Sequence, residues 1–370
     1  MEERKSMDFI DTENEYIVSV ITPCHEASLE LLRKAFDSLK AQSLAFEQLE
    51  WIVVVHNSSS DNLRQVEEMV APYTNVRLYK LRNEFHAASS PRNYALKRIR
   101  GTYVTFLDAD DLLESDYLEQ VVKGFSDEAI DAVFASMKKV NIDEKRKLKT
   151  GIGKKYDGNG EAVQIIDCGP DCESDMMHGS DLAVTAKTYR SSVILKHEIM
   201  FNEEVPIAED VLFNLQFLSY GRKVCLLKDF AGYIYSLRDD SEIQSMNKAS
   251  SRVLLCGMGF LKVLSYGYEK GFYMDNLLLD LIGYESAIVM ASVNLEMKHR
   301  KELKSAFAPY IAKLADVKPT SRYDDKLLKI LKIMPKIVLL HPYFMSFVAA
   351  MMRLFRVDTN KMTRKINEEK

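Results

Sequence analysis

The chain alternates short apolar runs with amphipathic stretches, and this alternation restricts its fold more than any other feature. Runs rich in β-branched and aromatic side chains, typical of buried strands, occupy residues 16–22 (YIVSVIT), 51–55 (WIVVV), 76–81 and 103–107 (YVTFL). Apolar residues at helical spacing occur in 29–43, 63–70 and 92–100. Strands that alternate with helices usually form a parallel sheet covered on both faces. We therefore predict an α/β fold with a Rossmann-like, mostly parallel sheet flanked by helices.

Polar turns follow three of these predicted strands. They begin at Pro23, at His56 and at Asp108. In an open α/β sheet, ligands bind outside the carboxyl ends of the strands. The three turns are therefore predicted to meet at the functional edge of the sheet.

The composition excludes several classes of protein. With 47% apolar and 28% charged residues, the chain is typical of a globular protein. Its net charge of −4 and its isoelectric point near 6.1 argue against a nucleic-acid partner. No apolar run follows the first residues, so we expect no secretory signal and a cytoplasmic location.

The five cysteines are scattered and odd in number, which does not suit a disulfide framework. Cys168 and Cys172, with His178 nearby, could be considered a metal cluster. No second pair follows at the spacing of a zinc site, so we do not favour this interpretation.

The sequence Asp108-Ala-Asp110 directly after a predicted buried strand is the strongest single chemical feature. Two carboxylates held close together repel each other, and a divalent cation neutralises them. Oxygen ligands of this kind suit Mg²⁺ or Mn²⁺. A solvated loop with a helix N-cap is the alternative, because aspartate favours both. Taken alone, the motif leaves the two interpretations equal.

The order of several motifs separates these interpretations. The motifs are SVITPCHE (19–26), SLKAQS (38–43), EWIVVVHNSSSD (50–61), SSPRNYAL (89–96), GTYVTFLDADD (101–111) and AEDVLF (208–213). In this order and spacing they resemble the family-2 glycosyltransferases with the GT-A fold, over about residues 17–241. The resemblance implies transfer of a sugar from a nucleotide-diphosphate donor, most simply a UDP-sugar, to an acceptor hydroxyl. It implies a metal-assisted, inverting reaction in the assembly of a surface polysaccharide or glycopolymer, with a glycan or lipid-linked acceptor.

The resemblance also implies roles for individual residues. Asp108 corresponds to the aspartate beside the donor ribose, and Asp110 to the ligand of the divalent cation, Mn²⁺ or Mg²⁺. Asp210 corresponds to the catalytic base, whereas the adjacent Glu209 is either part of that site or a helix N-terminal acid. The remaining residues expected beside the donor are Pro23, His25, Glu26 and Arg92, with Arg238 and Ser241 near its phosphates.

The turn after the second predicted strand departs from the family pattern. The usual Asp-Asp-Gly-Ser is here His56-Asn57-Ser58-Ser59, so the aspartate that accepts a hydrogen bond from the nucleobase is missing. The Asn57 carbonyl oxygen or a neutral His56 can serve as the acceptor. Alternatively, backbone groups hold the base. His25 is interpreted either as stacking on the base or as a solvent-facing loop residue.

Two other functional classes are kept as alternatives. Nucleotidyltransferases also place metal-binding aspartates at the end of an α/β sheet, but TPCHEAS (22–28) lacks their glycine-rich phosphate loop. A non-catalytic scaffold with the same fold is the other, and the altered His56-Asn57 turn supports it. The intact Asp108, Asp110 and Asp210 argue against it.

The middle and end of the chain have different patterns. Residues 127–172 are less regular. Within and after them, the basic, glycine-containing segment 145–155 and the segment 157–180, rich in Gly, Asp and Ser, predict loops over one face. After residue 241 the composition shifts to long helical segments. We therefore assign residues 1–245 to the catalytic domain and 246–370 to a helical C-terminal region, either membrane-associated or acceptor-related.

A nearly uncharged segment, 337–352, lies between basic flanks in this C-terminal region. It is short for a spanning helix and contains Pro342. It suits either a helix lying in an anionic membrane surface, at the inner face of the cell membrane, or a packed core helix. The sequence leaves the oligomeric state open.

Overall fold

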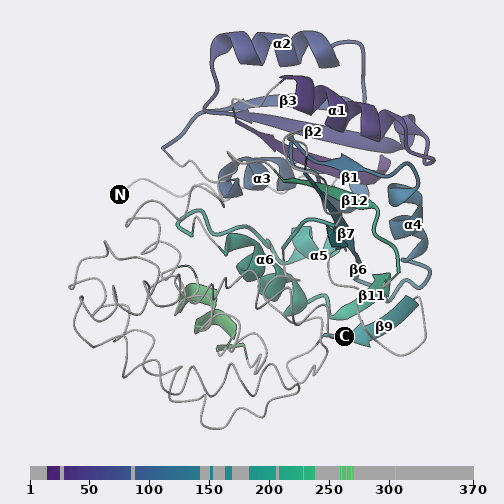
Figure 1. Cartoon of the computed structure of the whole chain (residues 1–370). Coiled ribbons are helices and arrows are strands. Elements are labelled where there is room, and N and C mark those ends of the chain that lie inside the picture. Colours follow the sequence, from purple (N-terminus) through teal and green to yellow (C-terminus); the bar gives the residue numbers. More distant parts are fainter. Residues whose placement is uncertain are drawn as a thin grey trace, which may run out of the picture. The chain divides into compact units, whose positions relative to one another are not determined.

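The computed structural model describes residues 15–25, 29–84, 88–141, 151–152, 163–168, 183–205, 208–227 and 229–237, with 259, 261–263, 265–267, 269–270 and 305. Its larger sheet has eight strands in the order β3-β2-β1-β4-β10-β6-β11-β9 (Figure 1). Their bounds, in that order, are Val76–Leu81, Leu49–His56, Tyr16–Cys24, Gly101–Phe106, Lys187–Arg190, Ala132–Ala135, Lys223–Leu227 and Val163–Asp167. A four-stranded sheet has the order β5-β12-β7-β8, formed by Leu112–Leu113, Tyr233–Leu237, Met137–Asn141 and Gly151–Ile152.

The pairing of the larger sheet confirms the predicted α/β class. Strands β3, β2, β1 and β4 are parallel neighbours, and β6 and β11 also pair in parallel. Strand β10 is antiparallel to both β4 and β6, and β9 is antiparallel to β11. The sheet is therefore mostly parallel, as the alternation of strands and helices predicts.

Helices cover both faces of this sheet. Their bounds are Leu29–Lys40 (α1), Ser60–Val70 (α2), Ser89–Leu96 (α3), Tyr117–Lys123 (α4), Ser191–Lys196 (α5) and Glu209–Leu218 (α6), with a 3₁₀ turn at Phe46–Gln48. Alternate side chains of a strand point to opposite faces. Val20 of β1 accordingly belongs to the buried cluster that contains Leu32 of α1. On the other face, Phe106 of β4 packs edge-on against Phe213 of α6.

The less regular segment 127–172 contains strands β6, β7, β8 and β9. The prediction of loops is wrong for β8 and β9, which lie within the ranges 145–155 and 157–180. The four strands are two to five residues long. Three of them pair with strands distant in sequence: β6 with β10 and β11, β7 with β12, and β9 with β11. Such short, non-locally paired strands give no periodic signal in the sequence.

The chain divides into two compact units, residues 1–176 with 182–239, and residues 177–181 with 240–370. The assignment of 246–370 to a separate helical region stays a prediction, because few of its residues are described. The apolar segment 337–352 lies outside the described residues. Among those described, the structure contains no helix of the length and apolar character needed to cross a membrane.

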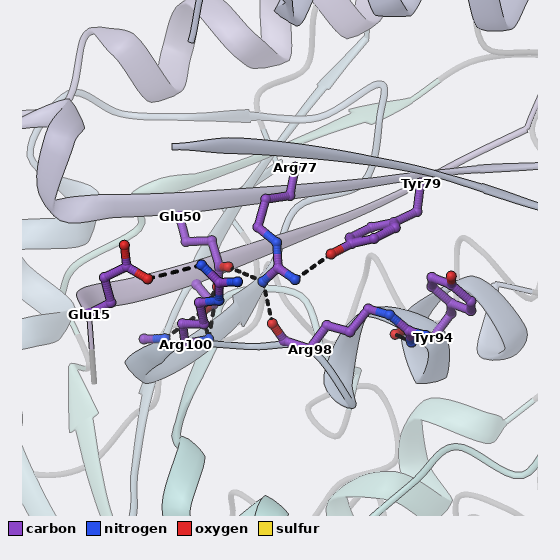
Figure 2. Close-up of polar contacts among 9 residues, drawn as sticks. Glu15, Glu50, Arg77, Tyr79, Tyr94, Arg98 and Arg100 are labelled. Atoms are coloured by element: carbon purple, nitrogen blue, oxygen red, sulfur yellow. Dashed lines mark hydrogen bonds and ion pairs between the residues drawn. The ribbon is translucent and has the colours of Figure 1, made fainter. Parts of the chain in front are cut away.

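A buried carboxylate fixes the starts of the central strands, at the edge opposite their carboxyl ends (Figure 2). Glu50 is fully buried, and its Oε2 accepts hydrogen bonds from Ser19 Oγ at 2.6 Å and from the Arg100 amide at 2.9 Å. Arg77 Nη1 pairs with Glu50 Oε1 at 2.5 Å. Gly101 donates its amide to Ser19 Oγ at 2.8 Å, and a Cβ there would overlap the Ser19 backbone. Residues of β1, β2, β3 and β4 thus share one network.

We expect Glu50→Gln to lower the free energy of unfolding by about 2–4 kcal/mol, because it leaves Arg77 without its buried counter-charge. Glu68→Gln is the matched control. It removes the exposed Arg64–Glu68 pair, whose side chains are 62% and 64% accessible, and should cost at most about 0.5 kcal/mol. Urea denaturation of both variants measures the difference. Equal losses would contradict a structural role for Glu50.

Candidate functional site

Three polar turns lie at the carboxyl edge of the large sheet. Strand β1 pairs in parallel with β2 up to Cys24 and Val55, and with β4 up to Ile21 and Phe106. The turns that follow these strands therefore leave the sheet at the same edge. Strand β1 ends at Cys24, one residue after Pro23, whereas the sequence predicts that the strand ends before this proline.

The centre of the candidate site is the guanidinium of Arg92, a buried residue of α3. Its Nη1 lies 2.8 Å from Asp210 Oδ1, and its Nη2 lies 3.0 Å from Asp108 Oδ1. Glu209 Oε1 lies 3.6 Å from Nη1. The rings of Phe106 and Phe201 lie 5.8 and 5.3 Å from the guanidinium carbon. One cation thus joins the aspartate after β4 to the acidic pair that begins α6.

The first turn of α6 presents the acidic pair. Ala208, which precedes the helix, has a left-handed backbone with φ of 67°, and Glu209 and Asp210 follow it. Acidic side chains are favoured in a first helical turn by the helix dipole. The Val184 amide donates to Asp210 Oδ2 at 3.3 Å. The two oxygens of Asp210 therefore have different partners, a guanidinium and a backbone amide.

The charges in this group shift the pKa values of its members. Burial alone would lower the pKa of Arg92, but the carboxylates of Asp210, Asp108 and Glu209 raise it above its ordinary value. Burial and the adjacent charge of Asp210 together raise the pKa of Glu209 to about 8. The folded protein therefore favours the protonated form of Glu209.

The turn after β4 separates its aspartates by environment. Asp111 is buried, and it accepts hydrogen bonds from the Tyr233 hydroxyl at 2.7 Å and the Ser236 amide at 2.8 Å. Burial, together with the charges of Asp108 and Asp110, raises the pKa of Asp111 well above its ordinary value. Asp108 and Asp110 are partly exposed. Only these two carboxylates of the turn are partly accessible to a ligand.

The donor set of this turn fits a divalent cation. In the described ranges, no three His, Cys, Asp or Glu side chains are grouped to hold a metal ion. Mg²⁺ needs fewer protein ligands than that, because it usually binds one or two carboxylates and completes its shell with substrate phosphates and water. Asp110, with Asp108, supplies such carboxylate oxygens. Cys168 is buried, and Cys172 and His178 lie outside the described residues.

The turn after β2 is held by Asn83. The backbone N–H of Asn83 donates to Asn57 Oδ1 at 3.1 Å, and Asn57 has a left-handed backbone with φ of 50°. His56 Nε2 lies 2.8 Å from Asn83 Oδ1, and His56 is buried. His25 Nδ1 donates to the His56 carbonyl at 2.8 Å. His25 is therefore tied to the neighbouring turn. Glu26 and Arg238 lie outside the described residues.

The structure adds residues that the sequence interpretation did not include. Asp111 had a signal, because it directly continues the Asp108–Asp110 run. The sequence gives no such signal for Tyr233, Val184 and Asn83, because each of them contacts a partner that is distant in the chain.

The family model for glycosyl transferase family 2 matches residues 19–172. This part of the chain therefore belongs to that family, and the large sheet with its flanking helices has the GT-A fold. The family resemblance seen in the sequence is confirmed.

Curated relatives are similar over about three fifths of the chain. The poly(ribitol-phosphate) β-N-acetylglucosaminyltransferase TarS of Staphylococcus aureus is 25% identical over 230 residues, which cover 61% of this chain and 37% of TarS. The enzyme TarP of the same species is 28% identical over 59% of this chain and 62% of its own length. The chain thus spans less than two thirds of the length of these relatives.

Solved structures support the fold. The crystal structure of S. aureus TarS superimposes with a TM-score of 0.60 at 19% identity, covering 88% of this chain and 54% of TarS. A complex of TarS residues 1–349 with UDP gives a TM-score of 0.58 at 20% identity, covering 87% of this chain and 88% of that one.

The raised pKa of Glu209 makes stability depend on pH. Between the ordinary value of 4.5 and the folded value of about 8, the folded state binds a proton that the unfolded state has lost. The free energy of unfolding should therefore fall as the pH rises through this window, by up to about 1.4 kcal/mol per pH unit. We expect Glu209→Gln to remove this contribution. Chemical denaturation from pH 5 to about 8 measures it.

The exposed Glu128 provides the control. Glu128→Gln should leave the dependence of stability on pH as in the unaltered chain. If the curve for Glu209→Gln also runs parallel to that of the unaltered chain, Glu209 does not hold the proton.

Proposed function

We propose that this chain is an inverting glycosyltransferase that moves a sugar from a UDP-sugar to a hydroxyl of a surface glycopolymer. The observation that carries the proposal is the Arg92 guanidinium, which joins Asp108 and Asp210 at the carboxyl edge of a family-2 domain. The relative TarS is named for transfer of N-acetylglucosamine to poly(ribitol phosphate), and it has been solved with UDP and with UDP-GlcNAc. These relatives support a UDP-sugar donor and an anionic glycopolymer acceptor.

Asp210 acts as the general base. Its two oxygens are held by Arg92 and by the Val184 amide, so the carboxylate has a fixed orientation. An ionised carboxylate has lone pairs beyond those two contacts and can accept the proton of an incoming hydroxyl. Burial raises the pKa of the adjacent Glu209 to about 8, which disfavours the ionised form that a base needs at neutral pH. A single base that activates the acceptor opposite the leaving group gives inversion at the anomeric carbon.

The leaving group acquires negative charge, and a divalent cation held at the turn after β4 would offset it. Asp108 contacts the donor ribose, and Asp110 holds a divalent cation, Mn²⁺ or Mg²⁺. When bound, that cation supplies Lewis-acid stabilisation of the diphosphate. Pro23, His25, Glu26 and Asn57 line the nucleobase side, and Arg238 approaches the phosphates.

Arg92 has a role in the protein before any ligand binds. Its positive charge offsets the repulsion between Asp108 and Asp210 and holds the two side chains close together. The family-2 match favours glycosyl transfer over nucleotidyl transfer. The non-catalytic alternative predicts that substitution of Asp210 has no effect on any turnover. A cytoplasmic location, and contact of residues 246–370 with the inner face of the membrane, stay predictions from the sequence.

We expect Asp110→Asn to keep the fold and to reduce donor turnover at least about 100-fold, since one carboxylate ligand is lost at a cation that contributes several kcal/mol. The assay is release of UDP from a panel of UDP-sugars with Mn²⁺ or Mg²⁺ present. Asp229→Asn, at an exposed position of the same charge, should retain full activity. Undiminished turnover of the unaltered protein in excess chelator would contradict the metal role.

Asp210→Asn should abolish transfer while UDP affinity changes little, because only stabilisation of the transition state is removed. General bases contribute roughly 10²–10⁴-fold to rate. Calorimetry with UDP measures binding, and UDP-sugar turnover with poly(ribitol phosphate) as acceptor measures transfer. Transfer within a few-fold of the unaltered protein would exclude Asp210 as the base.

A further inference from the structure

Four side chains link the segment before α6 to the turn after β2. Glu203 Oε2 lies 3.1 Å from Ser90 Oγ, which lies 2.6 Å from Asn83 Nδ2. Asn83 Oδ1 lies 2.8 Å from His56 Nε2. The second oxygen of Glu203 accepts a hydrogen bond from Asn93 Nδ2 at 2.8 Å. Ser90 and His56 are 4% and 2% exposed, whereas Asn83 and Glu203 are half-buried.

The Glu203 carboxylate at one end determines the donor and the acceptor of every hydrogen bond in this linkage. The Ser90 hydroxyl donates its single proton to Glu203 Oε2, because a carboxylate oxygen is a hydrogen-bond acceptor. Ser90 must then accept from Asn83, whose NH₂ group faces it. The carbonyl oxygen of Asn83 consequently faces His56, and Nε2 of His56 must carry a proton.

We infer that Glu203 is a positioning residue that fixes His56 in the tautomer protonated at Nε2, acting through Ser90 and Asn83. Neutral His56 then has a lone pair at Nδ1 and is a hydrogen-bond acceptor. The turn that carries His56 is the one in which the family pattern has an aspartate, which is also an acceptor. On the proposed function, on which this consequence rests, Glu203 thereby keeps a hydrogen-bond acceptor at His56, although His56 carries no carboxylate.

Glu203→Gln should reverse the direction of the hydrogen bonds from residue 203 to His56. The amide oxygen of the new glutamine would accept from Asn93 Nδ2, which leaves its NH₂ group to donate to Ser90. The Ser90 proton would turn to Asn83, and the Asn83 amide would rotate to present its NH₂ group to His56. Nε2 would then have to accept, which requires the tautomer protonated at Nδ1.

The test is the tautomer of His56, measured by long-range ¹H–¹⁵N correlation of the full chain labelled with ¹⁵N-histidine, at about pH 8, where neutral histidine dominates. The chain has seven histidines, and His56→Gln identifies the His56 signals by their loss. We expect the Nε2-protonated form in the unaltered protein and the Nδ1-protonated form in Glu203→Gln. Glu204→Gln, at the exposed neighbouring glutamate, should leave the spectrum of His56 unchanged.

Ser90→Ala provides a second variant if Glu203→Gln does not fold. It removes the hydrogen bond between residue 90 and Asn83, while Glu203 keeps its hydrogen bond to Asn93. Both tautomers of His56 should then be populated. An Nδ1-protonated His56 in the unaltered protein would overturn the inference. An Nε2-protonated form that persists in every variant that folds would overturn it as well.

Binding of UDP, measured by calorimetry, tests the functional consequence separately. We expect Glu203→Gln to weaken UDP binding about tenfold, the size of one mismatched hydrogen bond, and Glu204→Gln to leave it unchanged. Equal UDP affinity of Glu203→Gln and the unaltered protein, with the tautomer reversed, would refute the nucleobase-side role. If the unaltered protein does not bind UDP, the proposed donor is wrong, and the tautomer measurement still decides the inference.

Discussion

The buried guanidinium of Arg92 is the interaction on which the arrangement of the site depends. A charge enclosed by the Phe106 and Phe201 rings is costly unless opposite charges pair with it. Its partners come from the turn after β4 and from the first turn of α6, which are separate segments of the chain. Pairing all of them with one cation requires α3, β4 and α6 to take fixed relative positions. Packing of the domain and geometry of the site are therefore coupled through a single side chain.

The excess of acid around Arg92 separates the roles of the carboxyl groups. One guanidinium faces Asp108, Glu209 and Asp210, and Glu209 has the least exposed side chain of the three. Burial, with the adjacent charge of Asp210, raises the pKa of Glu209 to about 8. Burial acts in the same way on Asp111 beside Asp108 and Asp110. In each group of neighbouring acids, burial thus favours the protonated form of one member. Pairs of titratable groups whose environments separate their pKa values are typical of acid–base sites.

The sequence predicts those parts of the molecule that are specified locally. Strands β1, β2 and β4 have continuous apolar patterns, and Asp108, Asp110 and Asp210 lie in motifs that can be read without a structure. Strands β6, β7 and β9 are short and pair with strands far along the chain, so their sequence gives no clear strand pattern. The same reason applies to Tyr233 and Glu203. Their roles arise from contacts with Asp111 and Ser90, 122 and 113 residues away.

Helix α3 shows why a site residue can escape recognition by periodicity. Nearly all of its residues are buried, and those of its first turns are polar: Ser89, Ser90, Arg92 and Asn93. Such a helix is placed by directed hydrogen bonds rather than by an apolar face. Asn93 exchanges two bonds with the Phe201 backbone, at 2.9 and 2.8 Å. Ser90 and Asn93, three residues apart, both reach Glu203, whereas Arg92 reaches Asp108 and Asp210. One short helix therefore joins the turn after β2 to the Asp108–Asp210 cluster, and a shift of α3 would disturb both together.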